Sequence, residues 1–307
     1  MRVVFAGTPE VAVPSLEAVA AAGHHIVAVL TRPPAAQGRS SRLVPSPVHQ
    51  WAEGHGVPVL APDRARSPES VAALRNLAPD CCPVVAYGQL LTERLLAIPK
   101  HGWVNLHFSL LPAYRGAAPV QRAIMAGETE TGASTFRIVK ELDAGPVYGE
   151  VTTEIHPSDT AGTLLDRLAV LGAPLLVETL RRIEAGAEPV PQQDPETLSY
   201  AHKIEPDEVR LDWSRSAIEL DRLVRGASPE PGAWTTLGGD RFKVLLTAPV
   251  TGEGAAPGTI IPSRKTVHVA TGSGLLQLVT VQPVGKRPMT ACDWARGAHL
   301  GDQARFQ

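Results

Sequence analysis

The chain has 307 residues, 44% of them apolar, which is enough for one large domain or two ordinary domains with buried cores. Its net charge of −2 argues against binding nucleic acid by overall charge, because such proteins usually have a strongly basic domain. Residues 1–207 carry 17 basic and 22 acidic side chains (net −5), and residues 208–307 carry 12 and 9 (net +3). This distribution permits a polyanion against the C-terminal part without requiring one.

The N-terminal sequence, MRVVFAGTPE, enters an apolar run directly and has no basic leader, so we expect no signal peptide. No apolar stretch approaches the length of a membrane span. Cys81 and Cys82 are adjacent in an apolar run and Cys292 is distant, a spacing typical of neither a disulfide framework nor a metal site. We expect a cytoplasmic monomer without membrane contact or bound metal, in which Cys81 and Cys82 are buried structural thiols.

The first half of the chain alternates short apolar runs with helix-like stretches. The runs predict strands at 2–6, 25–30, 57–60, 82–86 and 103–108, with helices at 11–22, 47–53 and 69–77. This alternation is typical of an α/β fold with a doubly wound, mostly parallel sheet, Rossmann-like in architecture. Such sheets bind ligands beyond the carboxyl ends of their strands.

Later elements continue the same unit. Residues 134–139 and 146–155 predict a hairpin at the edge of the sheet. A long helix is expected after Asp159, with leucines at helical spacing, a kink at Pro174 and an end at Gly186.

The C-terminal third has a different pattern. Prolines among polar residues predict a linker over 189–206, which separates a domain over 1–188 from one over 207–307. Ser216 and Glu219 form a capping box that opens a short helix. Short apolar runs between Gly and Pro turns then predict a small, OB-like β-barrel from strands at 241–248, 258–261, 266–270 and 275–281.

Polar residues interrupt one of the predicted buried strands, in the sequence VNLHFSLLPAYRGAAP over 104–119. Asn105 and His107 are two residues apart, so both side chains point to one face of that strand. Asp143 lies in the sequence ELDAG, in a turn between two later strands. Taken singly, Asn105 is explained as a capping residue, His107 as a satisfied core histidine and Asp143 as a turn residue. Together, N-x-H-x-S-L-L-P-x-x-R-G-A-A-P followed by L-D-x-G is a long and specific pattern.

This pattern resembles the folate-dependent formyltransferases, most closely their branch that acts on methionyl-tRNA. The motifs FAGTPE (5–10), VVAYGQLL (84–91), RGAAP (115–119), LDAGP (142–146) and SYAHKI (199–204) occur in the family's order, so the resemblance covers essentially the whole chain. It implies transfer of the formyl group of 10-formyltetrahydrofolate to the α-amino group of initiator methionyl-tRNA. A related enzyme that formylates a small-molecule amine, such as an amino-sugar nucleotide, is the alternative.

The resemblance also implies roles for individual residues. Asn105, His107 and Asp143 match the catalytic trio. Asn105 and His107 would donate hydrogen bonds to the developing oxyanion, a contribution of roughly 3–4 kcal/mol per donor in other enzymes. Asp143 would hold the histidine and help move the amine proton through water. The folate site would comprise Ser109, Leu110, Leu111 and Pro112, with the loop of Tyr87, Gly88, Gln89 and Leu90 beside it.

Contacts with tRNA are expected from two regions. The family has a basic loop after its second strand, and here that loop holds Arg39 and Arg42, with serines where the family has a glycine and a lysine. The remaining candidates are basic residues in the predicted barrel and its turns: Lys243, Arg264, Lys265, Lys286 and Arg287.

Two other classes of function fit the sequence less well. A nucleotide-binding dehydrogenase would need G-x-G-x-x-G after the first strand, but residues 5–10 read FAGTPE. A non-catalytic RNA-binding protein would leave the combination of Asn105, His107 and Asp143 unexplained.

Overall fold

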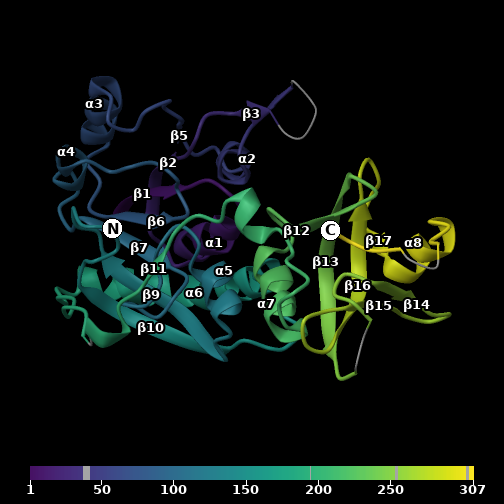
Figure 1. Cartoon of the computed structure of the whole chain (residues 1–307). Coiled ribbons are helices and arrows are strands. Elements are labelled where there is room, and N and C mark those ends of the chain that lie inside the picture. The colour runs from purple at the N-terminus through teal and green to yellow at the C-terminus, as the bar shows by residue number, and fades with distance from the viewer. Residues whose placement is uncertain (37–41, 194, 253–254, 302–303) are drawn as a thin grey trace. The chain divides into compact units, whose positions relative to one another are not determined.

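The computed structural model describes residues 1–36, 42–193, 195–252, 255–301 and 304–307 (Figure 1). Contacts within the chain divide it into two compact units. The first unit comprises residues 1–116, 131–153 and 165–200, and the second comprises residues 117–130, 154–164 and 201–307. Among the described residues, no helix is both long enough and apolar enough to cross a membrane.

The first unit is built on a seven-stranded sheet with the order β10-β9-β7-β6-β1-β2-β5. Strands β5, β2, β1, β6 and β7 pair in parallel, and β9 pairs with β7 antiparallel. The expected α/β fold with a mostly parallel sheet is therefore confirmed, and β9 and β10 are neighbours at its edge. The strands are β1 (Arg2–Gly7), β2 (His25–Leu30), β5 (Val59–Leu60), β6 (Cys82–Val85), β7 (Trp103–His107), β9 (Glu130–Arg137) and β10 (Val147–Glu154).

Helices connect these strands and begin where the sequence provides caps. The side chains of Ser46 and Ser67 accept hydrogen bonds from the first turns of α2 and α3, and a proline follows each serine at the first helical position. Pro174 lies inside α6, which continues past it. The helices are η1 (Glu10–Ala12), α1 (Val13–Ala21), α2 (Pro47–Gly54), α3 (Pro68–Leu77), α4 (Glu93–Leu96) and α6 (Ala161–Glu184).

Short segments complete this part of the fold. Strands β3 (Ala35–Ala36) and β4 (Leu43–Val44) pair with each other, as do β8 (Arg115–Gly116) and β11 (Tyr200–Ala201). The 3₁₀ helix η2 (Pro195–Thr197) also lies in the stretch expected to be a linker. Val190, in the same stretch, exchanges two backbone hydrogen bonds with Val147 at the start of β10. Part of the expected linker is therefore bound to the first unit.

The second unit contains an antiparallel sheet with the order β12-β13-β16-β15-β14, and β17 also pairs with β16. The expected capping box is confirmed, because Ser216 and Glu219 each bond the other's backbone amide at the start of α7. Strand β12 was not predicted from the sequence. The elements are α5 (Pro119–Ala126), η3 (Pro206–Val209), α7 (Ala217–Ala227), β12 (Ala233–Leu237), β13 (Asp240–Val250), β14 (Ile260–Pro262), β15 (Val267–Ala270), β16 (Leu275–Pro283), β17 (Met289–Thr290) and α8 (Ala291–Gly297).

Each unit has its own hydrophobic core. In the second unit, Phe306 packs against Trp213, Phe242 and Trp294 with ring centroids 5.1–6.0 Å apart. In the first unit, the core includes Cys82, Tyr87 and Trp103. Both Cys81 and Cys82 are fully buried, and burial raises the pKa of the Cys81 thiol to about 12. The prediction that they are buried thiols is confirmed.

Candidate active site

The expected catalytic residues lie at the carboxyl end of a parallel strand in the first unit. Asn105 and His107 are on β7, where Asn105 is paired in register with Val84 of β6. His107 is the last residue of β7, and its side chain is 7% exposed. Polar side chains therefore collect at the edge where open α/β sheets bind their ligands.

Both ring nitrogens of His107 face oxygen atoms. Nε2 donates a 2.9 Å hydrogen bond to the backbone carbonyl of Tyr114, and Nδ1 lies 3.9 Å from Oδ2 of Asp143. Burial lowers the pKa of His107, and the Asp143 carboxylate and the Tyr114 carbonyl oppose this effect. The lowered pKa favours the neutral imidazole. Because Nε2 carries the proton, Nδ1 has a lone pair and faces the carboxylate.

Asp143 is held in a strained turn between β9 and β10. It has the left-handed φ of +46°, which Asp tolerates better than most residues. Its Oδ2 accepts a 2.8 Å hydrogen bond from the backbone amide of Gly116, which fixes the carboxylate beside His107. Two residues on, a Cβ at Gly145 would come within 1.7 Å of the Arg137 carbonyl oxygen, so the turn requires glycine there. The structure therefore brings His107 and Asp143 together.

Asn105 is half-buried beside the same edge. Within the described part of the chain, no other group forms a hydrogen bond with its side-chain amide. A side-chain amide two residues from the end of a strand, with no hydrogen bond to the described part of the chain, suits a ligand oxygen.

The loop after β6, expected to contact folate, divides its side chains between the core and the solvent. Tyr87 is 2% exposed, and burial raises the pKa of its hydroxyl to about 12. Gln89 uses its side chain to hold the segment after β5, because it accepts from the amide of Ala65 at 2.7 Å and donates to the carbonyl of Pro62 at 3.0 Å. Leu90 is 74% exposed. A ligand at this loop would therefore meet Leu90 and backbone groups.

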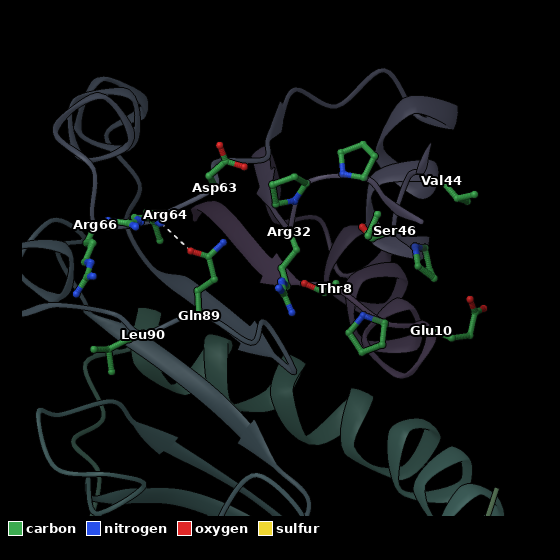
Figure 2. A pocket seen from close by; sticks show the side chains of 16 residues that line it. Thr8, Glu10, Arg32, Val44, Ser46, Asp63, Arg64, Arg66, Gln89 and Leu90 are labelled. Atoms are coloured by element: carbon green, nitrogen blue, oxygen red, sulfur yellow. Dashed lines mark hydrogen bonds between the residues drawn. The ribbon is translucent and has the colours of Figure 1, made fainter. Parts of the chain in front are cut away.

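A cavity of about 860 Å³ opens beside this loop (Figure 2). Its walls come from the segments that follow β1, β2, β5 and β6, which are neighbouring parallel strands. Sequence reasoning did not single out its three exposed arginines, Arg32, Arg64 and Arg66, which outnumber the acidic Glu10 and Asp63. The sequence could have identified these arginines by their position, because each follows a strand of the parallel sheet, where ligands bind. The volume and the excess positive charge fit an anionic organic molecule.

The second expected folate segment lies elsewhere in the first unit. Leu110, Leu111 and Pro112 line a separate cavity of about 630 Å³, together with the start of β10. Ser109 is fully buried and donates to the carbonyl of Ala113 at 2.7 Å. The two segments expected to share one folate thus border different cavities.

The basic residues expected to contact tRNA fall at one end of the sheet in the second unit. Lys243 is opposite Gln282, near the end of β16. The turn before β15 carries Arg264 and Lys265, and the turn after β16 carries Lys286 and Arg287. Because β15 and β16 are antiparallel, both turns lie at the same end. Those four turn residues are exposed, whereas Lys243 is half-buried and donates to the carbonyl of Pro231.

Two further predictions concern the basic loop. Arg39 lies outside the residues that the structure describes, whereas Arg42 is exposed just before β4.

The described residues contain no group of three or more His, Cys, Asp or Glu side chains that could hold a metal ion.

Comparisons with known proteins agree with this architecture. The sequence model named formyl transferase matches residues 1–180, and the model of the formyl transferase C-terminal domain matches residues 203–299. The methionyl-tRNA formyltransferase of Nocardioides sp. is 56% identical over 312 residues, covering 100% of this chain and 98% of the relative. That of Thermobifida fusca is 55% identical over 308 residues, covering 100% and 99%.

Solved structures share the fold at low sequence identity. The sugar 3N-formyl transferase WlaRD, solved with dTDP and 5-N-formyl-THF, is 16% identical with a TM-score of 0.66, covering 94% of this chain and 99% of its own. HypX from Aquifex aeolicus, in complex with tetrahydrofolic acid, is 17% identical with a TM-score of 0.67. The match covers 97% of this chain but only 47% of HypX. On the family models and the full-length relatives, this chain belongs to the formyl transferase family.

Proposed function

We propose that this enzyme transfers a formyl group from 10-formyltetrahydrofolate to the α-amino group of initiator methionyl-tRNA. The names of its full-length relatives support the reaction, and the pairing of His107 with Asp143 beside Asn105 supports the site. In the transfer, a bond forms between the amine nitrogen and the formyl carbon, and the bond from that carbon to the folate nitrogen breaks. The amine proton must move to the leaving nitrogen.

The chain supplies one oxyanion donor directly. The side-chain amide of Asn105 would donate to the formyl oxygen as negative charge develops there. A second donor from His107 would need the Nε2 proton, which the carbonyl of Tyr114 accepts in the structure. His107 therefore adds this donor only when the substrate oxygen replaces that carbonyl.

The pair formed by His107 and Asp143 is suited to accepting a proton. Nδ1, which has a lone pair while Nε2 donates to the carbonyl of Tyr114, lies 3.9 Å from Oδ2 of Asp143. A proton taken from the attacking amine would be held by both groups and then returned to the leaving nitrogen. An α-amino group has a pKa of about 7.7–8.0, so an acceptor is needed near neutral pH.

We place folate in the larger cavity, beside the 87–90 loop. Tetrahydrofolates carry carboxylates, and Arg32, Arg64 and Arg66 give this cavity its positive charge. Backbone groups of the loop and the exposed Leu90 would meet the ring end. A contribution from Ser109–Pro112 stays a prediction, because Leu110, Leu111 and Pro112 border the other cavity.

We place the body of the tRNA on the second unit, at the basic end of its sheet. Four basic residues are exposed there: Arg264, Lys265, Lys286 and Arg287. Arg241, at the start of β13, adds a fifth cation, and its guanidinium lies 4.3 Å from the ring centre of Trp234. Clustered cations of this kind bind phosphates and release counterions. Arg39 and Arg42 would contact the acceptor end.

The decisive experiment is formylation of purified initiator methionyl-tRNA with 10-formyltetrahydrofolate, with an amino-sugar nucleotide as the competing acceptor. We expect rapid formylation of the tRNA and none of the sugar. Formylation of the sugar alone would instead establish the small-molecule alternative.

A further inference from the structure

A glutamine outside the sequence motifs joins the two loops that surround His107. Gln192 lies in the stretch after α6, where Val190 is paired with Val147 at the start of β10. This pairing places Gln192 next to the turn that carries Asp143. Its side chain is half-buried, and both ends of its amide are used.

The amide nitrogen of Gln192 holds the Asp143 turn. Nε2 donates to the carbonyl of Asp143 and to the carbonyl of Gly145, each at 2.8 Å. The first of these carbonyls belongs to Asp143 itself, the residue with the left-handed φ of +46°. Two donors fixed on one side of the turn disfavour its relaxation to an ordinary right-handed conformation.

The amide oxygen of Gln192 holds the other loop. Oε1 accepts hydrogen bonds from the guanidinium of Arg115, from Nε at 3.2 Å and from a terminal nitrogen. Arg115 is flanked by Tyr114, whose carbonyl accepts the His107 Nε2 proton, and by Gly116, whose amide donates to Asp143. One side chain therefore connects the backbone segments that contact both ring nitrogens of His107.

We propose that Gln192 is a positioning residue, which fixes the Asp143 carboxylate at His107 Nδ1 by donating to the two turn carbonyls while Arg115 anchors its oxygen. This inference rests on the proposed function of the His107 and Asp143 pair. Gln192 itself touches no reacting atom. Gln192 borders the cavity of Leu110, Leu111 and Pro112 but not the larger cavity in which we place folate. Its loss would leave that larger cavity in place and misplace the proton acceptor.

The test compares Gln192→Met with Gln192→Glu, using steady-state formylation of methionyl-tRNA. Methionine keeps the length and loses every hydrogen bond, whereas glutamate still accepts from Arg115 but has no donor for the carbonyls. We expect both variants to lose about 10- to 100-fold in kcat, with KM for either substrate changed less than threefold, because small misplacement of a reacting group has effects of this size. A Gln192→Glu enzyme with wild-type kcat would overturn the proposal, since Arg115 anchoring alone would then suffice.

A double-mutant cycle separates positioning from general loosening. Once Asp143→Asn has removed the carboxylate, Gln192→Met should reduce kcat less than threefold further. Full additivity of the two losses would show that Gln192 acts elsewhere. Gln193→Met is the matched control, and it should behave as wild type. Among the described residues, its side chain bonds to the carbonyl of Pro191 at the surface and to no other group.

The same cycle distinguishes this inference from the proposed function. Wild-type turnover in the Asp143→Asn single variant would contradict the proposed proton-accepting role of His107 and Asp143, and with it the proposed function of this site. Impaired Asp143→Asn with unimpaired Gln192→Met would refute only the role of Gln192. If Gln192→Met melts well below wild type, the Gln192→Glu variant and the cycle measured at low temperature still decide between the outcomes.

Discussion

The carboxylate of Asp143 reaches from the turn between β9 and β10 and accepts a 2.8 Å hydrogen bond from the backbone amide of Gly116. That bond joins two loops separated by 27 residues and directs the carboxylate toward His107 Nδ1. The consequences for catalysis, stability and binding are open to measurement.

Removing a catalytic side chain should abolish most of the turnover without unfolding the protein. Asn105→Ala is expected to lower kcat by about two to three orders of magnitude, as the loss of an oxyanion donor does elsewhere. His107→Ala removes one member of the proton-accepting pair and is expected to lower kcat by a similar factor. Asp143→Asn keeps the side-chain shape but removes the proton acceptor, and its kcat should fall by about two to four orders of magnitude. Circular dichroism and melting curves serve as folding controls. A wild-type kcat in any of these variants would contradict the catalytic role assigned to the substituted residue.

His107 should also make stability depend on pH. Its pKa in the folded protein is lowered from the ordinary value of 6.5, chiefly by burial. As the pH falls below 6.5, the unfolded chain binds a proton that the folded protein does not, so stability is lost in that range. Melting temperatures of wild type and His107→Gln, measured from pH 8 to pH 5, test this. The wild type should lose more stability on acidification, and parallel curves would contradict the buried neutral imidazole.

Ligand binding should distinguish the two cavities. A saturating folate analogue, folinic acid, is expected to raise the melting temperature of the wild type, because it binds only the native state. Arg64→Ala and Arg66→Ala should each reduce this shift, and Lys100→Ala, an exposed cation outside the cavity, should not. If Leu110→Ala removes the shift while the arginine variants retain it, folate occupies the cavity beside β10 instead.

Binding of tRNA should depend on the basic end of the second unit. Neutralising Lys286 and Arg287 together is expected to weaken all tRNAs about equally and to reduce the slope of log K against log salt by about 1–2. Arg215→Ala is the control, because Arg215 lies by the 271–274 turn at the opposite end of the sheet. If the slope of log K against log salt is unchanged in the double variant, Lys286 and Arg287 do not contact the tRNA phosphates.

Arg39→Ala tests a different role on the same substrate. We expect it to reduce turnover on initiator methionyl-tRNA more than it reduces tRNA affinity. Measuring turnover on initiator and elongator methionyl-tRNA would reveal this, and wild-type initiator turnover would remove the loop from the mechanism.

The turn that carries Asp143 should not tolerate a side chain at Gly145. A Cβ there would lie 1.7 Å from a carbonyl oxygen, so Gly145→Ala must distort the backbone. We expect a loss of more than about 2 kcal/mol in the free energy of unfolding, together with low activity. Gly54→Ala is the control, since nothing lies within 4 Å of its Cβ position in α2. Equal denaturation midpoints for the two variants would contradict the clash.

The sequence by itself determined the order and type of many elements, although it did not predict α4, α5, β12, β17 or α8. Buried parallel strands such as β1 and β2 are continuous apolar runs, and serine followed by proline marks the starts of α2 and α3, so local chemistry was sufficient for both. The capping box of Ser216 and Glu219 is likewise local. Strand β12 was missed because AWTTL is a short run with a weak pattern.

The candidate site divides in the same way. Spacing along one strand was enough to place Asn105 and His107 on one face. Only the tertiary structure decided that Gln192 lies between Arg115 and the Asp143 turn, because it is 49 residues from Asp143 and its neighbours there depend on how Val190 pairs with Val147. Tertiary structure also decided that Leu110 and Gln89 line different cavities. Leu110 borders the cavity at the start of β10, and Gln89 borders the cavity beyond β1, β2, β5 and β6. Local sequence encodes which face a residue occupies, whereas long-range pairing decides which residues share a site.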